Sequence, residues 1–140
     1  MAGQYPTSLY AGLRNRKAFE DLESFCLFVG FSRSGHSLIG ALLDAHPNVV
    51  ISHELDPLRY TFARFSKWQI YSLILEGSQR YAKNLRQRGG YTYHVPGQWQ
   101  GKFSDLRVIG DKEGEGTTTK LRLYPKLLER FCRTIGISVN

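Results

Sequence analysis

The chain of 140 residues has little of what marks secreted, membrane-spanning or metal-binding proteins. Its two cysteines, Cys26 and Cys132, lie far apart among apolar neighbours and show neither CxxC nor Cys/His spacing. We therefore expect two buried, reduced thiols and neither a zinc site nor a disulfide framework. The longest apolar runs, Phe25–Gly30 and Leu38–Leu43, fall short of the roughly 18 to 20 residues that span a bilayer. The first residues lack the apolar block of a secretory signal, so a cytoplasmic protein with no membrane span is expected.

The composition is that of one packed domain. Apolar residues make up 41% of the chain and aromatic residues 13%, which excludes a wholly disordered protein. The 14 glycines follow no fixed period, which excludes a collagen-like chain. The net charge of +7 favours polyanionic partners, namely nucleic acid, an anionic membrane or a phosphorylated cofactor.

Short apolar segments alternate with helical patterns along the chain. Residues 1–24 are polar and weakly periodic, and we expect an N-terminal lead that has no stable structure of its own. The helix predicted at 37–45 is apolar nearly all round, so we expect it to be buried on both sides. This rhythm predicts an α/β fold, with a mainly parallel sheet flanked by helices. The expected strands are 25–30, 49–52, 106–110 and 137–140, and the expected helices are 37–45, 56–88 with a possible break near Gly77, and 125–135.

The segment from Val29 to Ser37 lies between a predicted strand and a predicted helix. Such a loop presents successive backbone N–H groups at the positive end of a helix, which is a site for an anion. Gly30 and Gly35 have the spacing of the phosphate-binding loop of NTPases, but His36 stands where that loop has lysine. Arg33 can donate two hydrogen bonds to phosphate or sulfate oxygens. We therefore expect an anion site without ATP or GTP hydrolysis.

The run around this loop resembles the opening of sulfotransferases that use 3′-phosphoadenylyl sulfate (PAPS). The resemblance is strongest to the tyrosylprotein and Golgi-type branch. It rests on Arg33-Ser34-Gly35, on the leucine-rich helix that follows, on His46-Pro47, on the strand 49–52 and on Glu54. It implies a P-loop NTPase-like sulfotransferase fold with PAPS as donor, PAP as product and no metal. Residues 25–140 would be the N-terminal portion of such a domain, after a lead of residues 1–24.

The resemblance also implies roles for residues of the loop. The backbone N–H groups of Ser34, Gly35, His36 and Ser37 would hold the 5′-phosphosulfate, and Arg33 would neutralise the bridging and leaving oxygens. His36 departs from the threonine or serine that is commoner in the family.

Glu54, after the second strand, would be the general base that takes the proton of an acceptor hydroxyl. Two other readings stay open: that Glu54 is a surface or helix-capping acid, and that His53 is the base. Lys112, after Asp111 at the end of the third strand, resembles a family lysine that contacts the leaving group. The alternative for Lys112 is a solvated loop lysine.

Two further segments could border the acceptor site. Residues 113–117 are expected to form a flexible turn. The aromatic segment 91–103, with Tyr93, His94, Trp99 and Gln100, either covers the acceptor pocket or packs on the sheet as an ordinary loop.

The resemblance ends at the fourth strand, without the Arg-Asn-Pro turn and later serine that hold the 3′-phosphate in the family. The domain therefore looks truncated, and we expect weak or no turnover from these 140 residues alone. Two other functions compete with sulfuryl transfer: a P-loop nucleotide kinase-like protein, and a non-catalytic basic module that binds nucleic acid through the helix predicted at 59–88. On the favoured reading no nucleic-acid partner is expected. The acceptor would carry a hydroxyl or an amine on a protein, carbohydrate or small molecule.

Overall fold

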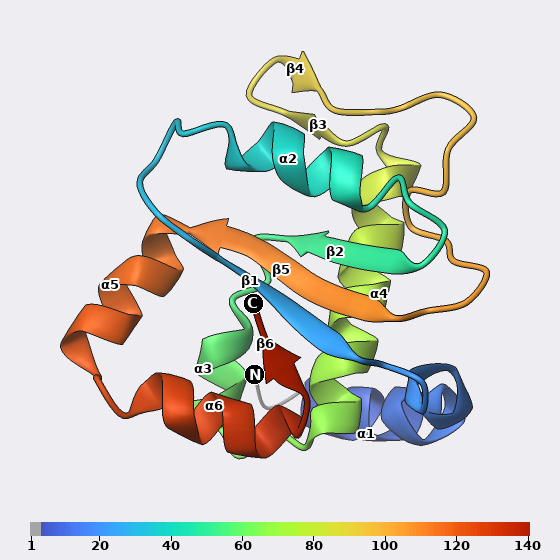
Figure 1. The fold of residues 1–140 in the computed structure, drawn as a ribbon. Helices are drawn as coiled ribbons and strands as arrows, with labels where there is room; N and C mark the ends of the chain where they lie inside the picture. The colour runs from blue at the N-terminus through green and yellow to red at the C-terminus, as the bar shows by residue number, and fades with distance from the viewer. Residues whose placement is uncertain (1–3) are drawn as a thin grey trace.

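A computed structural model describes residues 4–140 and has an α/β fold (Figure 1). Four strands form one sheet in the order β2-β5-β1-β6, and every neighbouring pair is parallel. The α/β class with a mainly parallel sheet, predicted from the sequence, is confirmed. The strands are β1 (Ser24–Val29), β2 (Val49–His53), β5 (Val108–Gly114) and β6 (Ser138–Val139).

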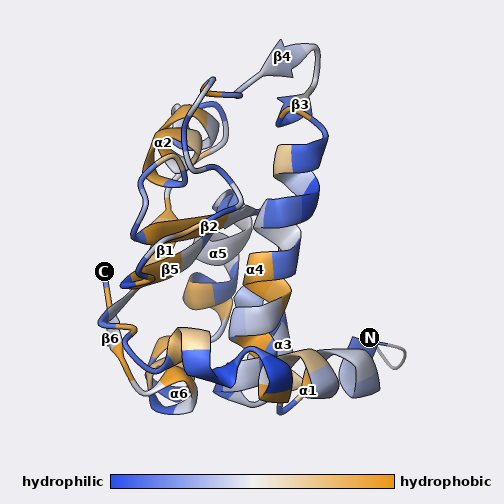
Figure 2. Ribbon diagram, turned by 90° about the vertical axis from the view of Figure 1, so that its right-hand side faces the viewer, coloured by the Kyte–Doolittle hydropathy of each residue, from blue (hydrophilic) through white to orange (hydrophobic). Residues whose placement is uncertain are grey.

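Helices cover both faces of this sheet. In both views α2 lies on one side of the sheet and α3 and α6 lie on the other (Figures 1 and 2). Helix α4 packs mainly against β2 and α1. No helix among residues 4–140 combines the length and apolarity that a bilayer crossing needs. The helical elements are α1 (Gln4–Arg14), the 3₁₀ turn η1 (Arg16–Phe19), α2 (His36–Leu43), α3 (Pro57–Phe62), α4 (Lys67–Lys83), α5 (Glu115–Leu123) and α6 (Leu127–Ile135), and a small hairpin joins β3 (Gln87–Arg88) to β4 (Tyr91–Thr92).

Alternate side chains of β1 belong to two hydrophobic clusters on opposite faces of the sheet. Phe25 and Leu27 point into the larger cluster, which α3, α4 and α6 complete. Cys26 and Phe28 point to the α2 side, where the cluster is much smaller. Successive side chains of a strand face opposite ways, so the apolar run of β1 serves both layers.

The N-terminal residues differ from the expected polar lead. Residues 4–14 form α1, which packs along α4, and Phe19 and Leu22 are buried in the main core. The approach is close because a Cβ on Gly12 would lie 2.9 Å from the backbone carbon of Trp68. The helix was missed because its contacts with α4 are distant in sequence and its own apolar period is weak.

The helix predicted at 56–88 is broken earlier than expected. The break falls at 63–66 rather than near Gly77, and Arg64 has φ +58° there. Ser66 then begins α4 with a capping box, in which its side chain and that of Gln69 bond each other's backbone N–H groups. The helix ends at Lys83. The expected flexible turn at 113–117 is also wrong, because β5 runs to Gly114 and α5 begins at Glu115.

Helix α2 is not buried on both sides. Gly40 and Ala41 are buried, whereas Leu38, Ile39 and Leu42 are about half exposed, at 54%, 50% and 55%. The residues of α2 are apolar nearly all round, but only one face of the helix meets the sheet. The orange colour of α2 in Figure 2 marks the apolar residues of this helix.

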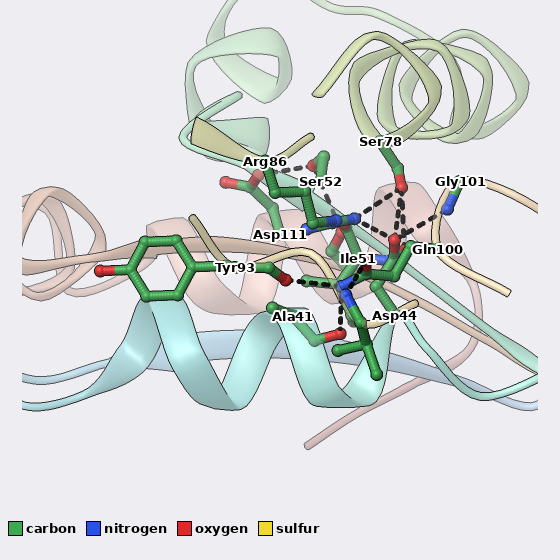
Figure 3. Close-up of polar contacts among 12 residues, drawn as sticks. Ala41, Asp44, Ile51, Ser52, Ser78, Arg86, Tyr93, Gln100, Gly101 and Asp111 are labelled. Atoms are coloured by element: carbon green, nitrogen blue, oxygen red, sulfur yellow. Dashed lines mark hydrogen bonds and ion pairs between the residues drawn. The ribbon is translucent and has the colours of Figure 1, made fainter. Parts of the chain in front are cut away.

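A buried ion pair joins α2 to the rest of the fold (Figure 3). The Arg86 guanidinium donates to the Asp44 carboxylate, and Asp44 is fully buried and Arg86 1% exposed. Asp44 also accepts hydrogen bonds from the Ile51 N–H at 2.6 Å and the Gly101 N–H at 2.9 Å. The Ser78 hydroxyl lies 2.9 Å from both carboxylate oxygens. Arg86 falls within the helix predicted at 56–88, but it lies beyond the end of α4, is buried and pairs with Asp44.

Burial disfavours the charged forms of Asp44 and Arg86, and their ion-pair and hydrogen-bond partners favour those forms. Burial raises the pKa of Asp44 to about 6, while Arg86 and the donors from Ile51, Ser78 and Gly101 act in the opposite direction. The same burial lowers the pKa of Arg86, which Asp44 opposes. Each charge is therefore tolerated in the core only because the other is present.

Replacing Arg86 with methionine should leave the Asp44 carboxylate buried without its counter-charge. We expect Arg86→Met to lower the free energy of unfolding by about 3–5 kcal/mol. The double variant with Asp44→Asn keeps one acceptor oxygen and removes both charges, so it should cost less than the two single changes added together. Urea denaturation measures all three. Arg80→Met, at an exposed position of α4, is the control, and an equal loss there would contradict the role of the pair.

Candidate functional site

A pocket of about 470 Å³ opens at the carboxyl ends of β1, β2 and β5. The chain passes from β1 to β2 on one side and from β5 to β6 on the other, so β1 and β5 form the point where the strand order reverses. Ligands of open α/β sheets bind at such a point. Six of the predicted site residues meet in this pocket, and of the predicted set only Ser34 does not line it. The lining residues are Phe31, Ser32, Arg33, Gly35, His36, Ser37, Leu38, Glu54, Tyr91, Tyr93, Lys112, Glu113 and Glu115.

The loop between β1 and α2 has the backbone geometry of an anion site. Gly35 has φ +81° and Arg33 has φ +63°, so the chain turns sharply before α2 begins at His36. Within residues 4–140, no oxygen accepts a hydrogen bond from the N–H groups of Ser34, Gly35, His36 or Ser37. A Cβ built on Gly35 would meet nothing within 4 Å. Four backbone donors of the described chain thus have no acceptor at the positive end of a helix, and the space beside Gly35 is open.

Helix α5 holds the start of this loop in place. The Gly30 N–H donates to the Thr118 hydroxyl at 2.7 Å, and that hydroxyl lies 3.0 Å from the Gly30 carbonyl oxygen. The Ser32 hydroxyl donates to the Glu115 carboxylate. The Ser34 hydroxyl donates to the Phe31 carbonyl at 2.6 Å. The bonds to Thr118 and Glu115 come from a helix 83 to 88 residues away in the sequence, so the local sequence of the loop does not predict them.

The His36 ring packs between the ends of β1 and β5. A Cβ on Gly30 would lie 2.8 Å from its ring, and one on Gly114 would lie 2.6 Å from its Nδ1. The ring also makes an edge contact with Phe28, with centroids 5.7 Å apart. Both glycines have positive φ. The imidazole therefore fills space that only glycine leaves free at the ends of β1 and β5.

Glu54 and Lys112 form an ion pair across the ends of β2 and β5. The Lys112 Nζ lies 2.9 Å from Glu54 Oε1, and the Glu54 N–H donates to the Lys112 carbonyl at 3.0 Å. The Lys112 side chain is 8% exposed and that of Glu54 is 33% exposed. His53 Nε2 lies 3.5 Å from the same carboxylate oxygen. Lys112 is thus a buried cation, not the solvated loop lysine of the alternative reading.

The path of β5 explains how Lys112 reaches the pocket. The pairing of β1 with β5 slips between Leu27 and Val29, so β5 carries one extra residue there. Bulges of this kind re-aim side chains beside functional sites. The Lys112 stem passes under Gly40 of α2, where an added Cβ would lie 3.2 Å from its Cγ. A glycine at that point of α2 leaves room for the lysine.

Asp111 fixes the turn that carries Glu54. This fully buried carboxylate accepts hydrogen bonds from the Ser52 hydroxyl at 2.5 Å, the Leu55 N–H at 3.0 Å and the Asp56 N–H at 3.1 Å. Burial raises its pKa, and these donors oppose the rise. Glu54 and Asp56 both have positive φ, at +56° and +62°. The side chain of Asp56, the residue before α3, makes no capping bond and pairs with Lys120 at 3.0 Å.

Four further polar lining side chains come from the two segments that the sequence analysis gave as possible borders of the acceptor site. Glu113 and Glu115 add carboxylates, and burial followed by the nearby Asp111 raises the pKa of Glu113. Tyr91 and Tyr93 come from the aromatic segment, so part of it does border this pocket.

The rest of the aromatic segment lies elsewhere. The Gln100 amide bonds the carbonyl oxygens of Ala41 at 3.0 Å and Tyr93 at 2.9 Å (Figure 3), which fixes the segment against α2. Trp99 and His94 do not line the pocket.

No group of three or more histidine, cysteine, aspartate or glutamate residues that could hold a metal ion occurs in the described part of the chain. Comparisons of the chain with protein-family models, with curated proteins and with solved structures found no match. The chemistry of the pocket therefore has to be inferred from its own residues: four free N–H groups, two cationic side chains, carboxylates and two phenols.

Removing the Asp111 carboxylate should release the turn that positions Glu54. We expect Asp111→Ala to lower the free energy of unfolding by about 1–3 kcal/mol, since buried donors lose their acceptor. Amide hydrogen exchange should speed up at Leu55 and Asp56, which donate to this carboxylate. Asp105→Ala, which removes an exposed pair with Arg107, is the control. Unchanged exchange at both amides would contradict the assignment.

Proposed function

We propose that this pocket transfers a sulfuryl group from PAPS to a hydroxyl-bearing or amine-bearing acceptor. One observation carries the proposal: an anion-binding loop with Arg33 opens onto the same pocket as a carboxylate, Glu54, paired with a buried lysine, Lys112. Sulfuryl transfer needs an anion cradle, a proton acceptor and cations beside the leaving group. These parts come from the ends of three neighbouring parallel strands.

The residues present fit the 5′-phosphosulfate group. The free N–H groups of residues 34–37 and the open space at Gly35 form a cradle for tetrahedral oxyanions. Arg33 is exposed at the rim, where its guanidinium can reach two oxygens of one anion. PAPS, when bound, supplies a sulfuryl group attached to a good phosphate leaving group.

Glu54 and Lys112 then have complementary tasks. The Glu54 carboxylate takes the proton from the acceptor oxygen or nitrogen as that atom forms its bond to sulfur. The bond from sulfur to the bridging phosphate oxygen breaks, and the negative charge left on that oxygen is neutralised by Lys112 and Arg33. The 2.9 Å ion pair holds both groups at the pocket.

The proposal extends to the family of folds to which this α/β structure belongs. A parallel sheet of order β2-β5-β1-β6, with the anion loop after β1, is compatible with a P-loop NTPase-like sulfotransferase fold. A nucleotide kinase-like activity is less well supported, because His36 packs between β1 and β5 where a kinase needs a lysine on the outer phosphates.

Calorimetric titration with PAP tests the proposed loop. We expect the chain to bind PAP and Arg33→Ala to weaken that binding by about tenfold or more, since a charge-assisted contact contributes about 1.5–3 kcal/mol. ATP with magnesium should bind more weakly. Arg80→Ala, with its exposed cation on α4, should bind PAP like the parent protein. Failure of the folded protein to bind PAP, or preference for ATP with magnesium, would overturn the proposal.

Changing Glu54 should separate binding from transfer. Glu54→Gln frees Lys112 from its carboxylate partner, so PAP should bind about fivefold more tightly. Sulfation of hydroxyl acceptors by PAPS should fall by about a hundredfold or more because the base is lost. Glu76→Gln, exposed on α4, should change neither quantity. Weaker PAP binding by Glu54→Gln would show that the carboxylate serves the structure and not the reaction.

A further inference from the structure

A second, apolar hollow of about 450 Å³ lies where α5 gives way to α6, beside the end of α3. We call it the α5–α6 hollow. It shares no lining residue with the pocket at the strand ends. Its lining residues are Phe62, Leu123, Tyr124, Pro125, Lys126, Leu127 and Arg130.

The hollow exists because Pro125 ends α5. The residue before a proline is pushed out of the helical region, and Tyr124 has φ −130° and ψ 78°. The break turns Leu123 and Tyr124 outward, where they are 67% and 52% exposed. The Tyr124 ring meets Phe62, itself 44% exposed, with centroids 5.2 Å apart. Three large apolar side chains thus stand open to solvent around one depression.

Cations without partners surround this apolar surface. Lys126 and Arg130 line the hollow, and Arg122 precedes Leu123 at its edge; all three are exposed. Among residues 4–140 no carboxylate forms an ion pair with any of them. Glu129, on the same helix, pairs with Arg133 instead, at 3.6 Å. The charge at the hollow is therefore positive and unneutralised.

We propose that the α5–α6 hollow binds a peptide segment of a partner protein in which a large apolar side chain is flanked by carboxylates. The apolar side chain would seat between Phe62, Leu123 and Tyr124, as anchors of interfaces seat in pockets. The flanking carboxylates would meet Lys126, Arg130 and Arg122, which fixes the sign of the partner's charge. This inference needs nothing from the proposed sulfuryl transfer.

The shape of the surface favours a peptide over a lipid membrane. Side chains that bind a bilayer project from an amphipathic face into the headgroup region. Here the apolar groups surround a depression, which receives a side chain from outside. An anionic membrane is the competing occupant, and the experiment below separates the two.

Fluorescence anisotropy with a labelled acidic peptide of sequence DEEFLED tests the proposal. A matched peptide, DEEAAED, keeps the length and the charges and replaces both apolar anchor residues with alanine. We expect the first to bind and the second to bind about tenfold more weakly. The variants Leu123→Asp and Lys126→Glu with Arg130→Glu should each lower affinity for the first peptide by about tenfold. Leu123 is largely exposed, so its replacement should leave the fold intact, which circular dichroism verifies.

Lys102→Glu is the matched control, because it reverses an exposed cation that does not line this hollow. It should leave peptide binding unchanged. Equal binding of the two peptides, or equal losses in Lys102→Glu and the hollow variants, would overturn the proposal by showing non-specific attraction to a basic protein. Vesicles of phosphatidylserine and phosphatidylcholine are tested in parallel. Sedimentation with those vesicles that depends on Leu123 and Lys126, without binding of DEEFLED, would assign the surface to membranes instead.

Discussion

The buried pair of Asp44 and Arg86 holds the two layers of the protein in one arrangement. Asp44 stands at the end of α2, and its partners come from β2, α4 and the segment after the hairpin. A charged carboxylate in the core is tolerable only with its full set of donors, so these four parts of the chain must be in place together. Helix α2 also carries the anion loop at its other end. The orientation of the loop is therefore set by a contact at the opposite end of the helix.

Asp111 plays a comparable part on the next strand. Both aspartates accept backbone N–H groups that have no sheet or helix partner, namely those of Ile51 on the edge strand β2 and of Gly101 at Asp44, and those of Leu55 and Asp56 at Asp111. At Asp111 this support stabilises a turn with two residues of positive φ, Glu54 and Asp56. Backbone strain of this kind persists where the surroundings over-determine it. The side chain that the reaction would need as a base thus stands on a turn held by a buried carboxylate.

Local patterns predicted the parts of this structure that depend on local sequence. The apolar run of β1, the β-branched run of β2 and the glycine-bounded loop after β1 were all recognisable, and the order of strands and helices predicted a parallel sheet. That arrangement brings Arg33, Glu54 and Lys112 to one edge. What failed depends on contacts between distant segments. By its local sequence Arg86 looks like a surface cation, and its burial depends on the ion pair with Asp44. The local sequence of α1 likewise looks like a polar segment, and its packing depends on contacts with α4. Tyr91 and Tyr93 reach the pocket only because Gln100 ties their segment to α2.

The outward face of α2 has a consequence for how the protein behaves in bulk. Leu38, Ile39 and Leu42 are half exposed there, and Phe31 is 75% exposed in the adjoining loop. The net charge of +7 keeps chains apart when the ionic strength is low. At about 0.1 M salt the screening length shrinks to about 10 Å, and the repulsion no longer offsets contact between apolar faces. The colloidal stability of concentrated solutions should therefore decline as salt is added, so dilute buffers are the natural medium for storage and for spectroscopy.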